Sequence, residues 1–308
     1  MIVDLLLVFA GLVLLVLGGD LLVKGAVNLS LRLGVAPVIV GLTVVAFGTS
    51  APELLVSVSA ALTGSTDIAL GNVVGSNTAN VLIILGASAF ISGITTKGHD
   101  LRASWVMMMA SSVLLIALAF TGEIGRVEGF VLLAVLAAVL WRQISTARAE
   151  RPEQVEGAEP GATGRQIAIW LIGGLIALPV GAHLLVMGAS DIARLMGISE
   201  AVIGLTLVAV GTSLPEMAAS VASAVRRRGD LALGNVVGSN IFNILAILGI
   251  TSVVAPLPVP PQMMHFDLWV MLGSSLLLAP FLFRGIPITR PVGGVFLAGY
   301  AAYVWVLL

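Results

Sequence analysis

The sequence predicts an all-α integral membrane protein made of two inverted copies of one five-helix unit. The chain is 58% hydrophobic and 10% charged, whereas soluble domains carry about 25% charged residues. Its apolar runs are long enough to cross a bilayer, which takes about 20 residues. A block from the first half also recurs in the second half. This composition excludes a soluble domain, and the net charge of −1 gives no sign of a nucleic-acid partner.

Hydropathy predicts ten spanning helices. The opening run lacks a basic leader and exceeds the roughly 7–15 apolar residues of a signal-peptide core, so we expect it to be the first span. The hydrophilic stretch STARAERPEQVEGAEPGATGR is expected to be a flexible connector. A single transmembrane transporter domain would then consist of repeat 1 (1–145), connector (146–164) and repeat 2 (165–308). The spans are expected at residues 2–29, 38–62, 67–92, 102–121, 124–145, 166–195, 201–225, 230–254, 266–284 and 288–308.

The distribution of Lys and Arg predicts the orientation of the chain. Cytoplasmic loops of membrane proteins carry an excess of these residues. Ten spans would place Arg126 and Arg194 on one side and most other basic residues on the opposite side. We therefore expect a multi-pass protein of the cell membrane, with both termini extracellular or periplasmic and the connector cytoplasmic. The cytoplasmic set is Arg32, Lys97, Arg102, Arg142, Arg148, Arg151, Arg165, Arg226, Arg227, Arg228, Arg284 and Arg290.

Two sequence blocks are repeated at a constant offset of 163 residues (204 − 41). GLTVVAFGTSAPELLVSVSAAL at 41–62 returns as GLTLVAVGTSLPEMAASVASAV at 204–225, and DIALGNVVGSNTANVLIILG at 67–86 returns at 230–249 as DLALGNVVGSNIFNILAILG. Five spans separate each element from its copy, and an odd number inverts the copy in the membrane. Inverted repeats with interrupted helices indicate a secondary transporter with a midplane site. An old duplication that preserves only packing is the alternative, but the best-repeated residues are polar ones that packing does not require.

Each repeat carries a proline inside an expected span. Pro52 has no N–H to donate to the Gly48 carbonyl, and Pro215 stands in the same relation to Gly211. In a membrane, freed backbone groups are tolerated only where they face protein or a polar cavity. We therefore predict that the second, third, seventh and eighth helices are interrupted, and that carbonyl oxygens near 46–49 and 209–212 can bind a cation.

Polar side chains recur every four residues along these helices, so they share one face. All of them are oxygen donors, which suit hard cations such as Ca²⁺, whereas transition metals favour His or Cys. The pattern predicts a site for Ca²⁺ and Na⁺ centred on Glu53 and Glu216. The stripes are Thr49, Glu53 and Ser57 with their copies Thr212, Glu216 and Ser220, and Asn72, Ser76 and Asn80 with their copies Asn235, Ser239 and Asn243.

The two central acids suggest a mechanism. An ionised carboxylate near the bilayer centre costs about 2.5–3.5 kcal/mol on insertion scales. An empty carrier with two such charges should not reorient readily. One Ca²⁺ or two Na⁺ would neutralise the pair, and a third Na⁺ would leave a net positive charge. A carrier that moves only when loaded exchanges ions, which is antiport.

The pairs GTSAPE with GNVVGSN and GTSLPE with GNVVGSN resemble the two α-repeats of the sodium/calcium exchanger family, within the cation/calcium antiporter superfamily. The resemblance covers both repeats and, through the ten-helix layout, nearly the whole chain. It implies exchange of several Na⁺ for one Ca²⁺, with alternating access by sliding of the first and sixth helices. It implies no enzyme activity, no cofactor and no obligatory protein partner beyond the ions and the bilayer.

The resemblance also implies roles for individual residues. Glu53 and Glu216 would bind Ca²⁺ directly, and Thr49 and Thr212 would supply backbone oxygens. Asn80 and Asn243 would lie at the centre; some relatives carry Asp at the position of Asn243, so this chain has two central acids. The flanking Na⁺ sites would be lined by Ala46, Ser50, Ser76, Ala209, Ser213 and Ser239.

Three other functions stay open on the sequence. A proton-coupled Ca²⁺ exchanger is the nearest, although such relatives tend to show GNA-x-E in place of GTS-x-PE. A channel is the second, because inverted repeats with half-helices also build pores, but paired central carboxylates do not suit a neutral pore. A membrane hydrolase is the third, and the sequence shows no Ser–His or metal-ligand signature for it.

Asp20 and His183 occupy equivalent positions in the first and sixth predicted helices. They could gate the carrier or sense pH, but residues of this kind more often find a local partner near the membrane interface. Arg226, Arg227 and Arg228 are expected to act as topology determinants, and contact with anionic lipid is a second role for them.

Overall fold

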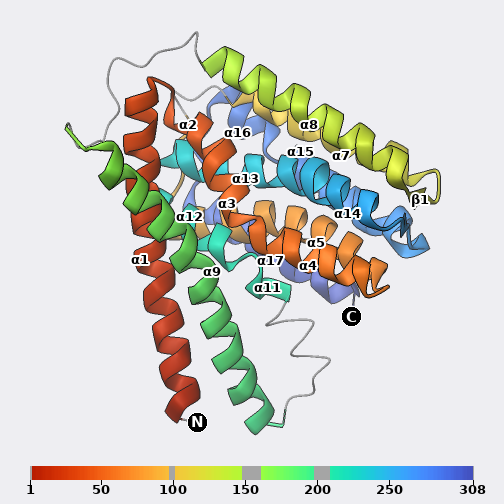
Figure 1. The fold of residues 1–308 in the computed structure, drawn as a ribbon, viewed down its shortest axis with the longest axis horizontal. Coiled ribbons are helices and arrows are strands. Elements are labelled where there is room, and N and C mark those ends of the chain that lie inside the picture. The colour runs from red at the N-terminus through yellow and green to blue at the C-terminus, as the bar shows by residue number, and fades with distance from the viewer. Residues whose placement is uncertain (1, 97–100, 148–160, 198–208, 308) are drawn as a thin grey trace.

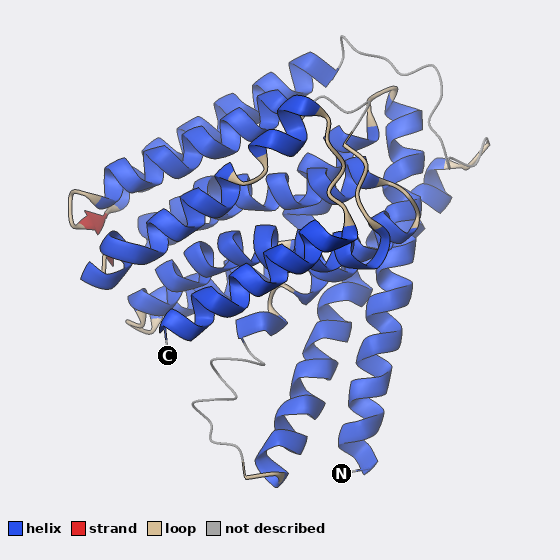
Figure 2. Ribbon diagram, turned by 180° about the vertical axis from the view of Figure 1, so that it is seen from behind, coloured by secondary structure: helices blue, strands red, loops and turns tan. Residues whose placement is uncertain are grey.

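The computed structural model describes residues 2–96, 101–147, 161–197 and 209–307, and this part of the chain is almost wholly helical (Figures 1 and 2). Seven of its helices are long and apolar enough to cross a membrane, and a bent pair makes an eighth. The start of the expected seventh span, at 201–208, lies outside the described residues. The prediction of a multi-pass all-α membrane protein is confirmed.

In the first repeat, helices occupy each of the ranges where hydropathy predicts a span. The second span is broken at Ser50, where Pro37–Thr49 and Ala51–Leu62 meet at 42°. The third span continues without a bend, and its interruption is a π-helical segment that starts at Asn80. The elements are α1 (Ile2–Leu33), α2 (Pro37–Val40), η1 (Gly41–Val45), α3 (Ala46–Thr49), α4 (Ala51–Leu62), α5 (Thr66–Ala79), η2 (Asn80–Leu85), α6 (Gly86–Ser92), α7 (Arg102–Ala119), β1 (Glu123–Ile124) and α8 (Arg126–Ala147).

The described part of the second repeat shares the central features of the first. A break at Ser213 corresponds to the one at Ser50, and a π-helical segment again begins at an asparagine, Asn243. All 14 residues of α13 are buried, so this helix forms the centre of the molecule. The elements are α9 (Gly164–Leu195), α11 (Ala209–Gly211), α12 (Leu214–Val225), α13 (Gly229–Phe242), η4 (Asn243–Leu248), α14 (Gly249–Val254), β2 (Leu257–Pro258), η5 (Met263–Asp267), α15 (Leu268–Leu276), α16 (Ala279–Arg284) and α17 (Arg290–Leu307).

Two short backbone contacts join the repeats away from the centre. The strands β1 and β2 pair in antiparallel register, with Ile124 opposite Leu257. An isolated bridge links Ile94 and Ile288 through two hydrogen bonds of 2.9 Å. These backbone contacts join loops of the two repeats. The helices of the two repeats meet at the candidate site.

The equivalent helices α1 and α9 form a close antiparallel pair that projects from the rest of the molecule (Figure 1). A Cβ at Gly181 would lie only 2.9 Å from the Gly11 carbonyl oxygen, so this contact requires glycine. Small residues allow such close approach between membrane helices. The Lys24 ammonium also lies 4.1 Å from the centroid of the Trp170 ring. These contacts join α1 and α9 into one unit.

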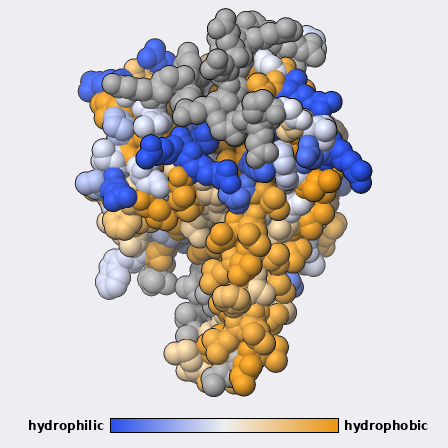
Figure 3. All heavy atoms as spheres, turned by 90° about the vertical axis from the view of Figure 1, so that its left-hand side faces the viewer, coloured by the Kyte–Doolittle hydropathy of each residue, from blue (hydrophilic) through white to orange (hydrophobic). Residues whose placement is uncertain are grey.

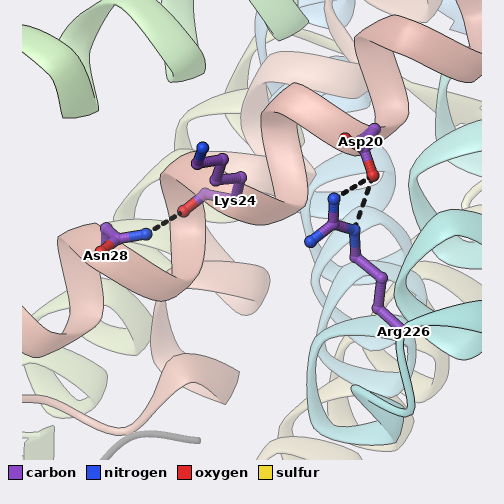
Figure 4. A network of polar contacts seen from close by, with 4 residues as sticks. All are labelled: Asp20, Lys24, Asn28 and Arg226. Carbon is purple, nitrogen blue, oxygen red and sulfur yellow. Dashed lines mark hydrogen bonds and ion pairs between the residues drawn. The ribbon is translucent and has the colours of Figure 1, made fainter. Parts of the chain in front are cut away.

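This unit packs unequally on the two repeats. The Cβ position of Gly19 on α1 lies 2.9 Å from the Ala218 carbonyl oxygen of α12. Leu55, the residue of α4 equivalent to Ala218, is 72% exposed. An ion pair closes the contact between α1 and α12, because Arg226 Nε donates to Asp20 Oδ1 at 2.6 Å (Figure 4). The half-helix α12 is therefore covered more closely by this unit than its copy, α4, is at Leu55.

The surface around α1 and α9 is divided by polarity. Figure 3 shows apolar side chains along the projecting half of this pair and hydrophilic residues gathered toward the opposite end. Exposed apolar residues on α1 include Ile2, Phe9 and Val16. An apolar surface of this extent suits a lipid environment, since monomeric soluble proteins rarely expose such patches.

Candidate cation-binding site

Two acidic residues lie at matching breaks in the chain. Ser50 has φ −83° and ψ 6°, and Ser213 has φ −88° and ψ 4°, so both leave the helical conformation. Proline follows in the first turn of α4 and of α12, where its missing N–H has no intrahelical partner to lose. Glu53 and Glu216 stand in those first turns and are each 1% exposed. The sequence prediction of paired, interrupted helices is confirmed.

Hydroxyl groups connect the acids across the repeat boundary. Ser50 Oγ donates to Glu216 Oε1 at 2.9 Å, and Ser213 Oγ donates to Glu53 Oε1 at 3.1 Å. Ser213 Oγ also lies 3.5 Å from Ser76 Oγ. Each acid is thus bound by the serine that precedes the other half-helix, which brings residues about half a chain length apart into one polar cluster.

Two equivalent asparagines fix the half-helices against the helices that follow them. Asn72 Nδ2 donates to the Glu53 carbonyl at 3.2 Å and to Ser57 Oγ at 2.9 Å. Asn235 makes the same two bonds, at 3.2 and 2.9 Å, to the Glu216 carbonyl and to Ser220. These bonds hold the backbone of each acid in place, so the carboxylates cannot easily withdraw from the cluster.

The threonines are placed less symmetrically. Thr49 is 1% exposed, and its hydroxyl lies 3.3 Å from Asn235 Oδ1. Its copy, Thr212, is half-buried. The two threonines are therefore buried to different degrees although they are equivalent in sequence.

Three of the other predicted residues, Ala46, Ser76 and Ser239, are buried. Ala46 is buried, and its Cβ lies 2.7 Å from the Cβ position of Gly238 on α13, so a larger residue at position 238 would separate α3 from α13. Ala209 begins α11, and its side chain lies outside the described residues. Ser76 and Ser239 are both buried on α5 and α13.

Asn80 and Asn243 are held by two further asparagines. Asn80 Nδ2 donates to Asn240 Oδ1 at 2.9 Å, and Asn243 Nδ2 donates to Asn77 Oδ1 at 3.0 Å. Neither Asn77 nor Asn240 is among the residues predicted from the sequence. The signal was present, since the triplet GSN places both at equivalent positions of the two repeats.

Several buried oxygen atoms of this cluster have no hydrogen-bond partner. Buried polar side-chain atoms are normally satisfied, so an unpaired group calls for an explanation. All of these atoms are acceptors or hydroxyls of residues that the sequence predicts as cation ligands. They are Glu53 Oε2, Glu216 Oε2, Asn80 Oδ1, Asn243 Oδ1 and Ser239 Oγ.

Neither central carboxylate forms an ion pair with a Lys or Arg of the described part of the chain; the ion pairs there involve Asp20, Asp191 and Asp230. Burying an ionised carboxylate without a partner is costly. Two carboxylates, two amide oxygens and a hydroxyl form an all-oxygen donor set, which hard cations prefer. The cluster thus has the ligand chemistry that a hard-cation site requires.

Inverted repeats around a central carboxylate pair define the chain as a membrane transporter of the secondary class. A family model described as sodium/calcium exchanger protein matches residues 3–145 and 166–308. The chain belongs to the sodium/calcium exchanger family, a family of transporters and not of enzymes.

Named relatives cover the full length of the chain. It is 36% identical to the putative antiporter CaxA of Alkalimonas amylolytica over 100% of this chain and 99% of the relative. It is 34% identical to the sodium/calcium exchanger MaX1 of Methanosarcina acetivorans, over 99% and 98% of the two chains. A solved structure of the sodium-calcium exchanger NCX_Mj, soaked with zero Na⁺ and Ca²⁺, superposes with a TM-score of 0.88 at 34% identity, covering 100% of this chain and 99% of its own.

Proposed function

We propose that this protein exchanges Ca²⁺ for Na⁺ across the cell membrane by alternating access, with the ions bound at a midplane site centred on Glu53 and Glu216. The observation that carries the proposal is the set of unpartnered buried oxygens, which includes one oxygen of each acid. The names of MaX1 and NCX_Mj support this choice of ions. The ions are the transported substrates, and no cofactor takes part.

The two acids, together with Asn80 and Asn243, would bind Ca²⁺. Ser76, Ser239, Ser50 and Ser213 would contribute to flanking Na⁺ sites. The main chain near Ala46, Thr49, Ala209 and Thr212 would supply carbonyl oxygens, because α3 and α11 end at the two breaks and the last carbonyls of a helix have no intrahelical donors. The serine hydroxyls can rotate, so Ser50 and Ser213 can donate to the acids in the ion-free state and turn a lone pair toward a bound cation.

The unequal packing of the two repeats supports alternating access. The α1–α9 unit lies on α12 and leaves Leu55 of α4 exposed. Sliding of this unit toward α4 would exchange the two environments, because the repeats are equivalent in sequence. Two uncompensated carboxylates would oppose this movement, and bound Ca²⁺ or Na⁺ would permit it.

The orientation and the repeat boundaries form part of the proposal. Both termini would face outward, and the connector (146–164) would be cytoplasmic between repeat 1 (1–145) and repeat 2 (165–308). The hydrophilic residues gathered at the end where α1 finishes and α9 begins support this orientation (Figure 3), since Arg32 and Arg165 lie at that end.

The test is ⁴⁵Ca²⁺ uptake into proteoliposomes that contain the full-length protein. An outward Na⁺ gradient should drive uptake in the wild type, and Glu53→Gln and Glu216→Gln should each reduce it to near the level of empty vesicles. A matched control is Glu128→Gln, a conservative change of an acid near the start of α8, which should transport normally. Wild-type uptake by both central variants would contradict the proposed site.

The same vesicles separate the alternatives. Uptake driven by a pH gradient and indifferent to Na⁺ would establish the proton-coupled exchanger instead. Uptake without any ion inside the vesicles, at a rate that does not saturate, would establish a channel.

A further inference from the structure

Two buried asparagines on α5 and α13 bind each other's main chains at the crossing of the repeats. Asn77 Nδ2 donates to the Asn240 carbonyl at 3.3 Å, and Asn240 Nδ2 donates to the Asn77 carbonyl at 3.2 Å. Each residue is 1% exposed. Asn77 Nδ2 also lies 3.8 Å from the sulfur of Met271. The Oδ1 atom of each is already used as an acceptor, so neither residue is a candidate ligand itself.

These bonds determine, one after another, how the side-chain amides of Asn77, Asn243, Asn240 and Asn80 are oriented. A main-chain carbonyl can only accept, so the amide that meets it must present its nitrogen. With Nδ2 of Asn77 on a carbonyl, its Oδ1 faces Asn243, which must therefore donate through its own Nδ2 at 3.0 Å. The remaining atom, Asn243 Oδ1, is the one left without a partner.

The equivalent series of hydrogen bonds, which starts from Asn240, ends at the equivalent atom of Asn80. Asn240 presents its nitrogen to the Asn77 carbonyl and its Oδ1 to Asn80 Nδ2, at 2.9 Å. Asn80 Oδ1 is again unpartnered and buried. Without these bonds either amide could rotate and present an N–H donor, which repels a cation.

We propose that Asn77 and Asn240 are positioning residues that orient the oxygens of Asn243 and Asn80 toward the cation. This inference rests on the proposed function. Each acts across the repeat boundary, since Asn77 orients a residue of repeat 2 and Asn240 orients a residue of repeat 1. Neither touches the ion. The oxygen-only character of the centre thus depends on the contact between the repeats.

The geometry predicts which residues are coupled. Asn77→Ala removes the acceptor for Asn243 but keeps the main-chain carbonyl that orients Asn240, so Asn80 keeps its orientation. Loss of a group that orients a metal ligand typically lowers affinity about 10–100-fold. The effect of Asn77→Ala should therefore require an amide at 243 and be independent of the amide at 80.

The experiment is a pair of double-mutant cycles on Ca²⁺ binding. Equilibrium ⁴⁵Ca²⁺ binding is measured on the purified full-length protein in Na⁺-free buffer. Asn77→Ala should weaken binding about 10-fold or more. In an Asn243→Ala background the same change should cost less than about twofold, whereas in an Asn80→Ala background it should again cost about 10-fold, because independent sites add.

Two results would overturn the positioning role. One is wild-type affinity in Asn77→Ala; the other is an equal loss in both backgrounds, which would indicate a general structural defect. The mirrored cycles, Asn240→Ala combined with Asn80→Ala and with Asn243→Ala, test the same idea if Asn77→Ala does not fold. A wild-type protein that binds no Ca²⁺ would contradict the proposed function itself, and this is seen before any variant is measured.

Discussion

Replacing Asn243 by Asp changes one buried nitrogen to oxygen at nearly constant volume. In the structure Asn243 Nδ2 donates to Asn77 Oδ1 at 3.0 Å, and Asn243 Oδ1 has no partner. The aspartate would have no N–H to donate. Asn77 cannot turn its own nitrogen toward it, because that nitrogen is bonded to the Asn240 carbonyl. The variant would thus place two acceptors face to face.

The ion-free protein should be destabilised by this change. A buried group left without its hydrogen bond costs about 1–3 kcal/mol. Repulsion from Glu53 and Glu216 adds to this, since two unit charges about 5 Å apart interact by about 3 kcal/mol at an effective dielectric constant of about 20. The thermal unfolding temperature of Asn243→Asp in buffer free of Na⁺ and Ca²⁺ should therefore fall below that of the wild type.

Bound Ca²⁺ should reverse the effect of Asn243→Asp, so that the substitution stabilises the Ca²⁺-bound protein. The attraction between a divalent cation and the new carboxylate is about twice the repulsion between unit charges at the same separation. Even a quarter of it, about 1.5 kcal/mol, raises affinity about tenfold. Asn243→Asp should therefore bind Ca²⁺ at least about tenfold more tightly, whereas Asn243→Ala, which removes the oxygen without adding charge, should bind more weakly than the wild type.

The assay is a Ca²⁺ titration of the unfolding temperature of purified protein, because a ligand that binds only the folded state stabilises it in proportion to ln(1 + [L]/Kd). The expected order of Ca²⁺-induced shifts is Asn243→Asp, then wild type, then Asn243→Ala. Identical shifts in all three proteins would refute the placement of Asn243 Oδ1 against the cation.

Further substitutions probe the half-helices and the α1–α9 unit. Ser213→Ala removes a charge-assisted hydrogen bond to Glu53 worth about 1.5–3 kcal/mol, and Ser50→Ala does the same at Glu216. Each variant should change the Na⁺ concentration that gives half-maximal exchange. Unaltered Na⁺ dependence in both variants would count against the role of the two hydroxyl groups. Gly181→Leu should abolish folding or transport, because its side chain would enter the backbone of α1; a monodisperse, active variant would disprove the close contact. Asp20→Asn should lower the free energy of unfolding by less than about 1 kcal/mol, since exposed ion pairs contribute little. Adding Arg226→Gln to this variant should cause no further loss of stability. Fully additive losses of stability in the two variants would show that the two residues do not interact.

The repeats, the helix breaks and the acids at the breaks were predictable from sequence because each depends on local chemistry. Pro52 and Pro215 lack a backbone donor wherever they stand, and the offset of 163 residues identifies their equivalence. The sequence could also predict an all-oxygen cluster. It could not show that Ser50 reaches Glu216 while Ser213 reaches Glu53, because those pairings arise only when the two half-helices cross.

The rest depends on partners that periodicity does not reveal. Asn77 and Asn240 interact through main-chain carbonyls 163 residues away, and nothing in the spacing of a helix face indicates such a bond. The π-helical segments that begin at Asn80 and Asn243 change the helix period locally, so a 3.6-residue pattern misses them. The partner of Asp20 was likewise invisible, because Arg226 becomes its neighbour only through the packing of α1 on α12.

Release of ⁴⁵Ca²⁺ from preloaded proteoliposomes shows whether exchange by this protein is obligatory. Vesicles are diluted into medium containing Na⁺, Ca²⁺ or choline as the only added cation. Charge compensation of Glu53 and Glu216 before reorientation predicts rapid release into Na⁺ or Ca²⁺ medium and retention in choline. Equally fast release into choline would show that the empty carrier returns freely with both carboxylates uncompensated, and would contradict the account.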